Sequence, residues 1–404
     1  MSEWRPRLTT ALSTALNSLP DAVGRVLRPA RYRGMPAQLP LIEPLPAASR
    51  RVLLGAVNTA GQAHRWARAI SARPDTVAVS LSRIDTGFAF EVDIAVPSVV
   101  ATASRSWQRE HVRIRGYSAT DVVIESGLPI FGPAFGWNLE REVRALQQRG
   151  IRVAIVCHGS DVRDFEALNA RNPHSPYLLP EFADRLAAMQ RRSAEARRVI
   201  RRTGVPVLGS TQGVPLDLPE AVWVPVVVDP AAWVVETPPL EGTAPPLVVH
   251  APSQAAIKGS DTVDEVLARL EADGLVRYER VSNATHDEVR EVYRRADIMI
   301  DSLRMGGYGA AACEAMAAGR VVVSNAAAEY RQQLRAERGI ELPIVQADPV
   351  TLEAVLRGIV ADRSAARAVA AAGPAYVAAL HDGRESARLI LEALDRPSAL
   401  EPRG

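Results

Sequence analysis

Cysteine is scarce in this sequence. Only Cys157 and Cys313 occur among 404 residues, each in an apolar stretch and neither in a CxxC or Cys/His spacing. This scarcity excludes a disulfide framework and the usual cysteine-based zinc sites. A chain of this length buries roughly three-quarters of the surface that its unfolded form exposes, so it needs no such cross-links. We expect both thiols to be reduced and buried.

Long apolar runs and an excess of charge are also missing. No stretch approaches the ~18 consecutive apolar residues that span a bilayer, and the first residues lack the apolar region of a secretory signal. The net charge of +2 is too small to indicate nucleic-acid binding by itself. We therefore expect a cytoplasmic globular protein of two or three domains that does not bind nucleic acid.

Residues 1–45 differ from the rest of the chain because they are rich in arginine and poor in acidic residues. Their leucines recur at helical spacing, which predicts one amphipathic helix through Leu8, Leu12, Leu16 and Leu19. Two interpretations remain open. The helix could contact a partner or anionic lipid, as a peripheral attachment to the inner face of a membrane. Alternatively, the segment is an extension that packs on its own domain.

From Arg51 onward, apolar runs of strand length alternate with helical segments. The runs are apolar throughout, as expected for parallel strands that are buried on both faces. Such alternation predicts a parallel sheet covered by helices. The expected strands are 52–57, 121–124, 152–157 and 205–208, and the expected helices are 62–71, 138–149 and 182–202.

A proline-rich stretch from Val234 to Pro246 interrupts this pattern and predicts a linker. The alternation then resumes, with strands at 247–250, 276–281, 297–300 and 320–324 and helices at 260–273, 287–295 and 310–318. Residues 349–394 have a wholly helical pattern. We therefore expect an α/β protein with two Rossmann-like, doubly wound domains facing across a cleft. The expected parts are an extension (1–45), an N-terminal domain (46–235), a C-terminal domain (236–375) and helices that pack back on the N-terminal domain (376–404).

Ligands of such sheets bind outside the carboxyl ends of the strands, so residues that directly follow strands are the candidate site residues. The first such turn is Asn58-Thr59-Ala60-Gly61-Gln62, which opens a helix. Its backbone N–H groups and the helix dipole favour an anion, which makes Asn58, Gly61 and Gln62 candidates for a phosphate or acceptor loop. The turn lacks the GxGxxG pattern, so an ordinary strand-to-helix turn remains the alternative.

The second strand end is His158-Gly159-Ser160-Asp161. A histidine at this place, beside a glycine, could face the cleft and either bind a substrate hydroxyl or stabilise developing charge. We therefore take His158 as the candidate catalytic residue. The alternatives are a structural histidine that closes the loop, and an Asp161 that serves as a helix N-cap.

The third strand end runs from Ser253 to Lys258, and Gly259 precedes a helix. A lysine beside exposed amides at a helix start suits a diphosphate. A solvated surface lysine is the alternative.

The fourth strand end holds Gly306, Gly307 and Gly309 around Tyr308, followed by an alanine-rich helix that carries Glu314. Glycines let the backbone approach a ligand closely, and the first N–H groups of the helix point at the same place. The Glu314 carboxylate, about one and a half turns further on, could accept two hydrogen bonds from a ribose diol. The alternative is a glycine-rich turn with a buried glutamate that a partner must satisfy.

These residues resemble the donor site of the family-4 retaining glycosyltransferases. The resemblance covers roughly residues 222–361 and rests on Ala296-Asp297-Ile298, Lys258-Gly259, Gly307-Tyr308-Gly309, Glu314-Ala315-Met316-Ala317-Ala318-Gly319 and Val321-Val322-Val323-Ser324.

This resemblance implies the GT-B fold, a nucleotide-sugar donor, retention of anomeric configuration and no metal or other cofactor. By the same resemblance, Lys258 would hold the diphosphate, Glu314 the ribose and His158 the transferred sugar. The amides of Gly307, Tyr308 and Gly309 would approach the phosphate or the sugar.

Two positions depart from the family's pattern. Gly306 stands eight residues before Glu314, where the family usually has a glutamate, and Pro252 stands six residues before Lys258, where it usually has an arginine. The loss of a guanidinium removes a bidentate phosphate contact. We expect either Ser253 with backbone amides or Arg304 to take its place.

The sequence thus predicts a hexosyltransferase-like glycosyltransferase that moves a sugar from a nucleotide-diphosphate donor to an acceptor that the motifs do not specify. Two alternatives remain open: an inactive transferase-like partner or regulatory protein, and another GT-B enzyme such as a nucleotide-sugar epimerase or a phosphorylase. The arginine-rich helix at 182–202 is either a solvated face or a surface for an anionic acceptor or membrane.

Overall fold

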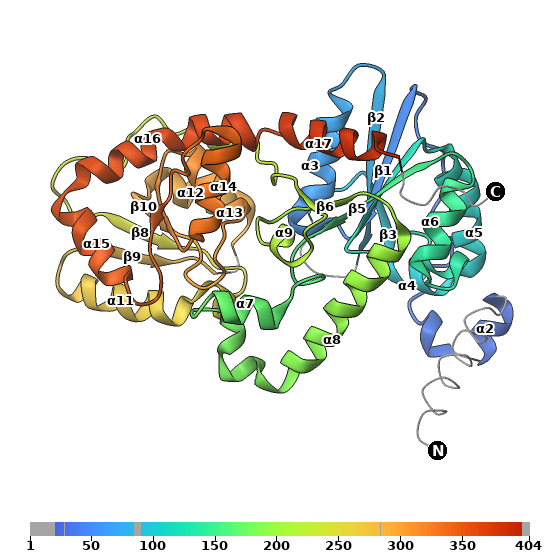
Figure 1. The fold of residues 1–404 in the computed structure, drawn as a ribbon, viewed down its shortest axis with the longest axis horizontal. Coiled ribbons are helices and arrows are strands. Elements are labelled where there is room, and N and C mark those ends of the chain that lie inside the picture. The colour runs from blue at the N-terminus through green and yellow to red at the C-terminus, as the bar shows by residue number, and fades with distance from the viewer. Residues whose placement is uncertain (1–20, 28, 85–89, 283, 398–404) are drawn as a thin grey trace.

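The computed structural model describes residues 21–397 of the chain, except 28, 85–89 and 283. Two α/β domains lie side by side, each built around a parallel sheet (Figure 1). This architecture confirms the predicted fold class. The amphipathic helix expected through Leu8 and Leu19 lies outside the described residues. No helix within the described ranges is both long enough and apolar enough to cross a membrane.

The N-terminal sheet, as far as the chain is described, has seven parallel strands in the order β3-β2-β1-β4-β5-β6-β7. The strand order reverses between β1 and β4, which is where a doubly wound sheet opens a crevice. The strands are β1 (Arg50–Ala56), β2 (Thr76–Ile84), β3 (Ile94–Pro97), β4 (Asp121–Glu125), β5 (Arg152–Cys157), β6 (Val207–Gly209) and β7 (Val222–Trp223).

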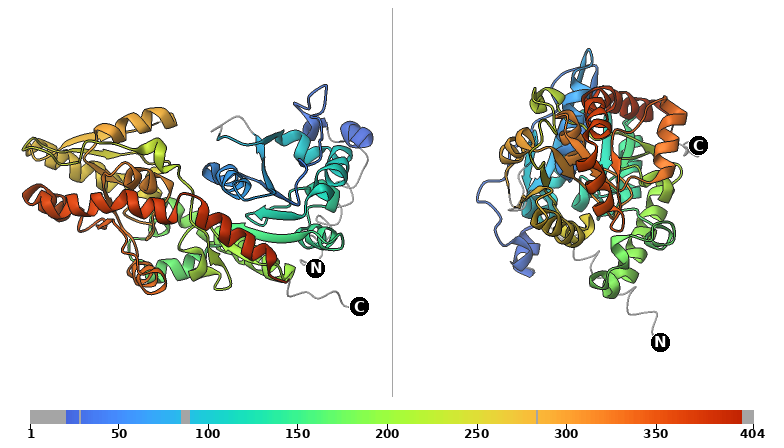
Figure 2. Two further views of the ribbon diagram at one scale, coloured as in Figure 1. Left: turned by 90° about the horizontal axis from the view of Figure 1, so that it is seen from above. Right: turned by 90° about the vertical axis from the view of Figure 1, so that its left-hand side faces the viewer.

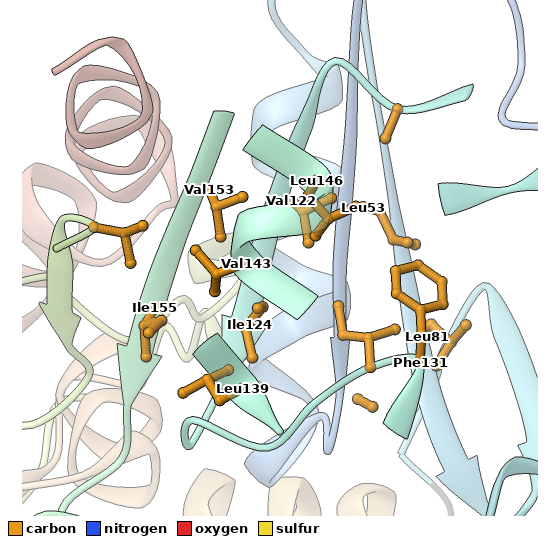
Figure 3. Close-up of a cluster of buried hydrophobic side chains, with 14 of the residues drawn as sticks. Leu53, Leu81, Val122, Ile124, Phe131, Leu139, Val143, Leu146, Val153 and Ile155 are labelled. Carbon is orange, nitrogen blue, oxygen red and sulfur yellow. The ribbon is translucent and has the colours of Figure 1, made fainter. Parts of the chain in front are cut away.

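Helices cover this sheet and enclose its main core. They are α3 (Gln62–Ser71), α4 (Ser98–Ala103), α5 (Arg105–Ile114), α6 (Leu139–Gln147), α7 (Phe165–Arg171), α8 (Pro180–Thr203) and α9 (Val214–Asp217), whereas α2 (Asp21–Leu27) lies apart from the sheet (Figure 1). Figure 3 shows side chains of α6, such as Val143 and Leu146, packed against Val122, Val153 and other side chains of the strands. Each such fully buried aliphatic side chain contributes roughly 1.5–3 kcal/mol, so the strand ends that carry the site rest on a rigid base.

The C-terminal sheet is smaller, with the order β12-β11-β10-β8-β9. Its strands are β8 (Leu247–His250), β9 (Arg277–Arg280), β10 (Ile298–Ile300), β11 (Val321–Ser324) and β12 (Val345–Gln346). Its helices are α10 (Ala255–Lys258), α11 (Ser260–Ala272), α12 (His286–Arg295), α13 (Ala310–Ala317), α14 (Ala328–Arg338), α15 (Leu352–Ala361) and α16 (Arg363–Leu380). Helix α13 follows β10, so its N-terminus lies at the carboxyl edge of this sheet.

The chain crosses between the domains twice, at neighbouring places. Val228 and Trp233 already pack in the C-terminal core, so the first crossing comes ahead of the proline-rich residues 234–246. The second crossing follows α16 at His381, whose carbonyl oxygen accepts a 2.8 Å hydrogen bond from the Val228 N–H group. Helix α17 (Arg384–Asp395) then packs against α3 of the N-terminal domain. Figure 2 (left) shows α16 and α17 running along one side of both domains.

The described end of the N-terminal extension contacts its own domain. The carboxylate of Asp21 accepts hydrogen bonds from the Arg105 N–H group (2.8 Å) and from the Ser104 hydroxyl (2.8 Å) at the start of α5. The Arg31 guanidinium donates to the Thr102 carbonyl oxygen at 2.7 Å. The part of the extension that is described therefore packs on the N-terminal domain.

Helix α16 packs closely on α13 at Gly373, which gives a first testable prediction. A Cβ atom on Gly373 would lie 2.6 Å from the carbonyl oxygen of Met316 and 3.1 Å from its Cα. Overpacking of this kind typically costs about 1–3 kcal/mol, whereas the helix propensity gained from glycine to alanine is about 0.5–1 kcal/mol. Pro374 follows directly and disfavours a helical Cβ-bearing residue before it. Gly373→Ala should therefore lower the free energy of unfolding, as measured in urea.

Gly358 in α15 is the matched control, because no heavy atom lies within 4 Å of the Cβ that alanine would add there. Gly358→Ala should raise the free energy of unfolding by about 0.5–1 kcal/mol. Equal stability of the two variants would contradict the close packing of α16 on α13.

Candidate functional site

A cavity of about 440 Å³ lies between loops of the two domains. Its C-terminal wall includes Lys258 and the glycine loop, defined here as residues 306–309. The N-terminal wall comes from the loops around α7 and α9, which lie at the side of their domain that faces the C-terminal domain (Figure 1). The Asn172 side-chain amide links the walls by donating a 2.7 Å hydrogen bond to the Arg304 carbonyl oxygen. The cavity is therefore a site that only both domains together can form.

Lys258 ends the short helix α10 and lies on this wall, as the sequence predicted for a phosphate-binding lysine. Its ammonium group pairs with Oδ1 of Asp301, which directly follows β10. The Asp301 carboxylate is 2% exposed, and its Oδ2 has no hydrogen-bond partner among the described residues. The lysine is thus held at the cavity by a buried carboxylate rather than solvated at the surface.

The glycine loop forms the floor of the cavity beside the start of α13. Gly306 has φ +74°, which strains any L side chain, so a glutamate at this position would not fit this backbone conformation without cost. A Cβ atom on Gly307 would lie 2.9 Å from the Gln212 Oε1 of the opposite domain. Gly309 is the N-cap of α13 and provides no side-chain cap for the helix N–H groups. These first amides are left for a ligand or water.

Tyr308 lines the cavity but directs its hydroxyl into the protein. That oxygen lies 2.5 Å from the Tyr376 hydroxyl, 3.0 Å from the Tyr330 hydroxyl and 3.1 Å from Nε2 of His381. Burial raises the pKa of Tyr308, and the neighbouring tyrosines add to this effect. The phenol therefore stays neutral and fixes the loop to α14, α16 and the second crossing.

Glu314 does not line the cavity. It lies 7% exposed on the part of α13 that faces α12 and α3, where its Oε1 is 3.0 Å from Nε2 of His286 and 3.8 Å from the Arg65 guanidinium. The partner that a buried carboxylate needs is thus supplied by the protein. Because Glu314 is not among the cavity-lining residues, a nucleotide that contacted both would have to extend beyond the cavity.

His158 is also held within the protein. Its Nδ1 lies 2.9 Å from the Ser210 hydroxyl and its Nε2 lies 3.1 Å from Oε1 of Glu125. Its ring stacks on Trp66, with centroids 6.0 Å apart. Both ring nitrogens are engaged, and His158 is not among the cavity-lining residues. In this structure the loop histidine orders the ends of β4, β5 and β6. The alternative of Asp161 as a helix N-cap is wrong, because Asp164 is the N-cap of α7. The Asp161 carboxylate instead accepts hydrogen bonds from the His158 and Gly159 N–H groups within the loop.

The backbone N–H groups at the start of the turn 58–62 bind a carboxylate of the protein itself. Oε2 of Glu125 accepts hydrogen bonds from the Val57 and Asn58 N–H groups at 2.9 and 2.8 Å. The Gln62 side chain makes two hydrogen bonds at the first crossing. It accepts from the Val227 N–H group (2.6 Å) and donates to the Val227 carbonyl oxygen (3.2 Å). Gly61 has φ +73° at the helix start. The turn therefore anchors the domain junction and does not line the cavity.

Neither expected substitute for the missing arginine reaches the cavity. Ser253 is exposed and is not among the cavity-lining residues. The Arg304 guanidinium pairs with Asp261 at 3.1 Å, and only its backbone meets the opposite domain. These positions follow from the loop paths, which strand-end patterns do not specify.

Several residues of the N-terminal wall were not predicted: Arg163, Arg171, Asn172, Thr211 and Gln212. Arg163 follows β5 by six residues. The rule that strand ends carry ligand contacts points to this loop, but the side chain in it that lines the cavity is Arg163 and not the predicted His158. The loop at 211–213 follows β6 in the same way.

Comparisons with known proteins agree with this fold. Residues 243–362 match the family described as Glycosyl transferases group 1. Sucrose-phosphate synthase from Thermosynechococcus elongatus is 12% identical, covering 85% of this chain and 98% of its own, with a TM-score of 0.57. Anabaena Alr3699/HepE in complex with UDP and glucose is 13% identical, covering 86% and 100%, with a TM-score of 0.52. A glycosyltransferase from Rickettsia africae is 11% identical, covering 86% and 98%, with a TM-score of 0.51. No curated protein sequence matches the chain.

The fold is that of solved GT-B glycosyltransferases, with two parallel-sheet domains and a cavity between them. More particularly, the C-terminal domain has the sequence pattern of the group 1 glycosyltransferases over residues 243–362.

Proposed function

We propose that this protein transfers a sugar from a nucleoside-diphosphate donor to an acceptor, with retention of configuration and without a metal ion. The cavity supports this most directly, because it brings Lys258 and the uncapped start of α13 to one place. A cation beside helix N–H groups stabilises the negative charge of a diphosphate. The structural similarity to a protein solved with UDP and glucose favours a nucleotide donor.

The proposed roles follow from the wall on which each residue lies. Lys258 and the amides at the start of α13 hold the diphosphate, and the glycine loop lets the sugar approach the backbone. The ribose extends past α13 toward Glu314 and His286. In the transfer, the anomeric carbon–oxygen bond to the diphosphate breaks and the acceptor oxygen bonds to the same face of that carbon. The acceptor proton passes to the leaving diphosphate. For His158 we propose a positioning role, because both its ring nitrogens are engaged.

The decisive experiment is a binding and turnover screen of the full chain. Titration calorimetry with uridine and guanosine diphosphates should show binding, and mass spectrometry of a donor panel should show sugar release or transfer. EDTA should leave the turnover unchanged, and NMR of the product should show the donor's anomeric configuration. An absence of binding and of turnover with every common donor would refute the proposal.

Glu314→Ala tests the ribose role. We expect it to raise the donor KM or abolish turnover while the unfolding midpoint stays close to that of the parent protein, because His286 is exposed enough to be solvated when its partner is removed. Steady-state donor hydrolysis measures the effect. Glu291→Gln on the outer face of α12, where the glutamate pairs with Arg294 in solvent, is the control and should be neutral. Parental kinetics in Glu314→Ala would show that the ribose is bound elsewhere.

A further inference from the structure

Arg163, in the loop between β5 and α7, is a buried cation without an internal partner. Its side chain lines the cavity although the residue is only 5% exposed. Its guanidinium makes no hydrogen bond and no ion pair with any residue in the described part of the chain, and its buried Nε is left without a partner. A buried charge in this state is costly, and proteins normally pair it or use it to bind a ligand.

The carboxylates nearest in the loop sequence are committed elsewhere. Asp161 accepts from backbone N–H groups, including that of Gly159 at 2.8 Å. Asp164 pairs with Arg197 at 3.0 Å. Asp217, the last residue of α9, pairs with Arg171 at 2.8 Å. The fold therefore supplies carboxylates to the neighbouring arginines but leaves the charge of Arg163 uncompensated.

The backbone around this guanidinium is kept clear by glycine. Gly159 has φ +123°, and a Cβ atom there would lie 2.7 Å from Nη2 of Arg163 and 3.5 Å from the Thr211 hydroxyl oxygen. That hydroxyl is itself buried and has no hydrogen-bond partner among the described residues. A planar cation and a hydroxyl, both unpartnered and both at the cavity, match the needs of a phosphate oxygen.

We propose that Arg163 binds the diphosphate of the donor from the N-terminal wall, opposite Lys258, and supplies the guanidinium that is missing at Pro252. The proposal rests on the proposed function for the identity of the ligand. It places the two cations of the diphosphate site on different domains, so donor binding joins the two walls of the cavity.

The test measures binding of inorganic pyrophosphate, uridine diphosphate and uridine to the full chain and its variants by titration calorimetry. Arg163→Gln should weaken pyrophosphate and uridine diphosphate at least tenfold and leave uridine unchanged. Arg163→Lys should recover part of the loss, because it keeps the charge but not the planar fork. Arg191→Gln, on the exposed face of α8, makes the same charge change away from the cavity and should bind like the parent protein.

Stability separates this role from a structural one. Removing an unpaired buried charge should leave the unfolding midpoint of Arg163→Gln equal to or above that of the parent protein, whereas a structural arginine would lower it. Pyrophosphate should also compete with uridine diphosphate. If pyrophosphate and uridine diphosphate bound at the same time, the anion that Arg163 binds would belong to the acceptor, and the proposal would be overturned.

The outcomes distinguish the two proposals. Unchanged affinities in Arg163→Gln, with uridine diphosphate still bound, would overturn the role of Arg163 and leave the proposed function intact. If pyrophosphate binding depended on Arg163 but no nucleoside diphosphate bound, the proposed donor would be refuted and the anion-binding role of Arg163 would stand. If the parent protein bound neither pyrophosphate nor any nucleoside diphosphate and turned over no common donor, both proposals would be refuted.

Discussion

Replacing Lys258 with alanine is expected to lower kcat/KM for donor turnover roughly 30- to 1000-fold, because a lost electrostatic contact to a developing charge costs about 2–4 kcal/mol. The ammonium group lies at the cavity and is fixed by Asp301. As the diphosphate leaves, its negative charge grows, so the contact strengthens in the transition state and the loss should appear in kcat as well as in KM. Release of nucleoside diphosphate in the donor-hydrolysis assay measures the effect.

The same substitution leaves the Asp301 carboxylate buried without its cation, which could unfold the domain and mimic a loss of catalysis. The double variant Lys258→Ala/Asp301→Asn removes both charges and should keep the fold while remaining inactive. Lys258→Arg keeps the charge and should retain more activity than either. Parental kcat/KM in a folded Lys258→Ala variant would rule out a phosphate role for this lysine.

The parts of the fold that the sequence predicted best are strands buried on both faces. Residues 152–157 and 247–250 were predicted as strands and are β5 and β8. Strand β2 was missed, because Ser80 and Ser82 interrupt its apolar run. The protein satisfies Ser80 by a 2.7 Å hydrogen bond to Asp93, a contact between two segments that hydrophobic periodicity does not register. Edge strands of two residues, such as β7 and β12, are too short to give any pattern.

The candidate site could be predicted where the loop after a strand has glycines or helix N–H groups that can approach a ligand, together with a side chain of suitable charge. Lys258 and the glycine loop meet these conditions, and both line the cavity. His158 and Glu314 have suitable chemistry, but their orientation depends on tertiary partners. His158 is hydrogen-bonded to Glu125 and Ser210, and Glu314 pairs with His286 and Arg65. Arg163 illustrates the converse, because a surface arginine and a buried unpaired one have the same sequence signature.

His381 links the glycine loop to the domain junction through two hydrogen bonds that the neutral ring satisfies. With the proton on Nδ1, the ring donates to the Val226 carbonyl oxygen at 2.7 Å, and Nε2 accepts from the Tyr308 hydroxyl at 3.1 Å. Burial lowers the pKa of His381 to about 4, against the ordinary value of 6.5. Between pH 6.5 and about 4, His381 therefore stays neutral in the folded protein but is protonated in the unfolded chain.

The sign of the effect on stability follows from this difference. The contribution of His381 is fully present above pH 6.5 and is lost as the pH falls toward 4, by up to about 3 kcal/mol. His250, whose pKa burial also lowers to about 4, acts in the same direction. His381→Gln should thus be less stable than the parent protein at pH 7.5 but should lose less stability between pH 7.5 and 5. Urea unfolding at both pH values gives the two slopes. His250→Gln should flatten the slope similarly without touching the domain junction. If His381→Gln keeps the parental pH dependence, the neutral ring is not what connects Tyr308 to Val226, and the glycine loop must be held to the junction by the tyrosine cluster alone.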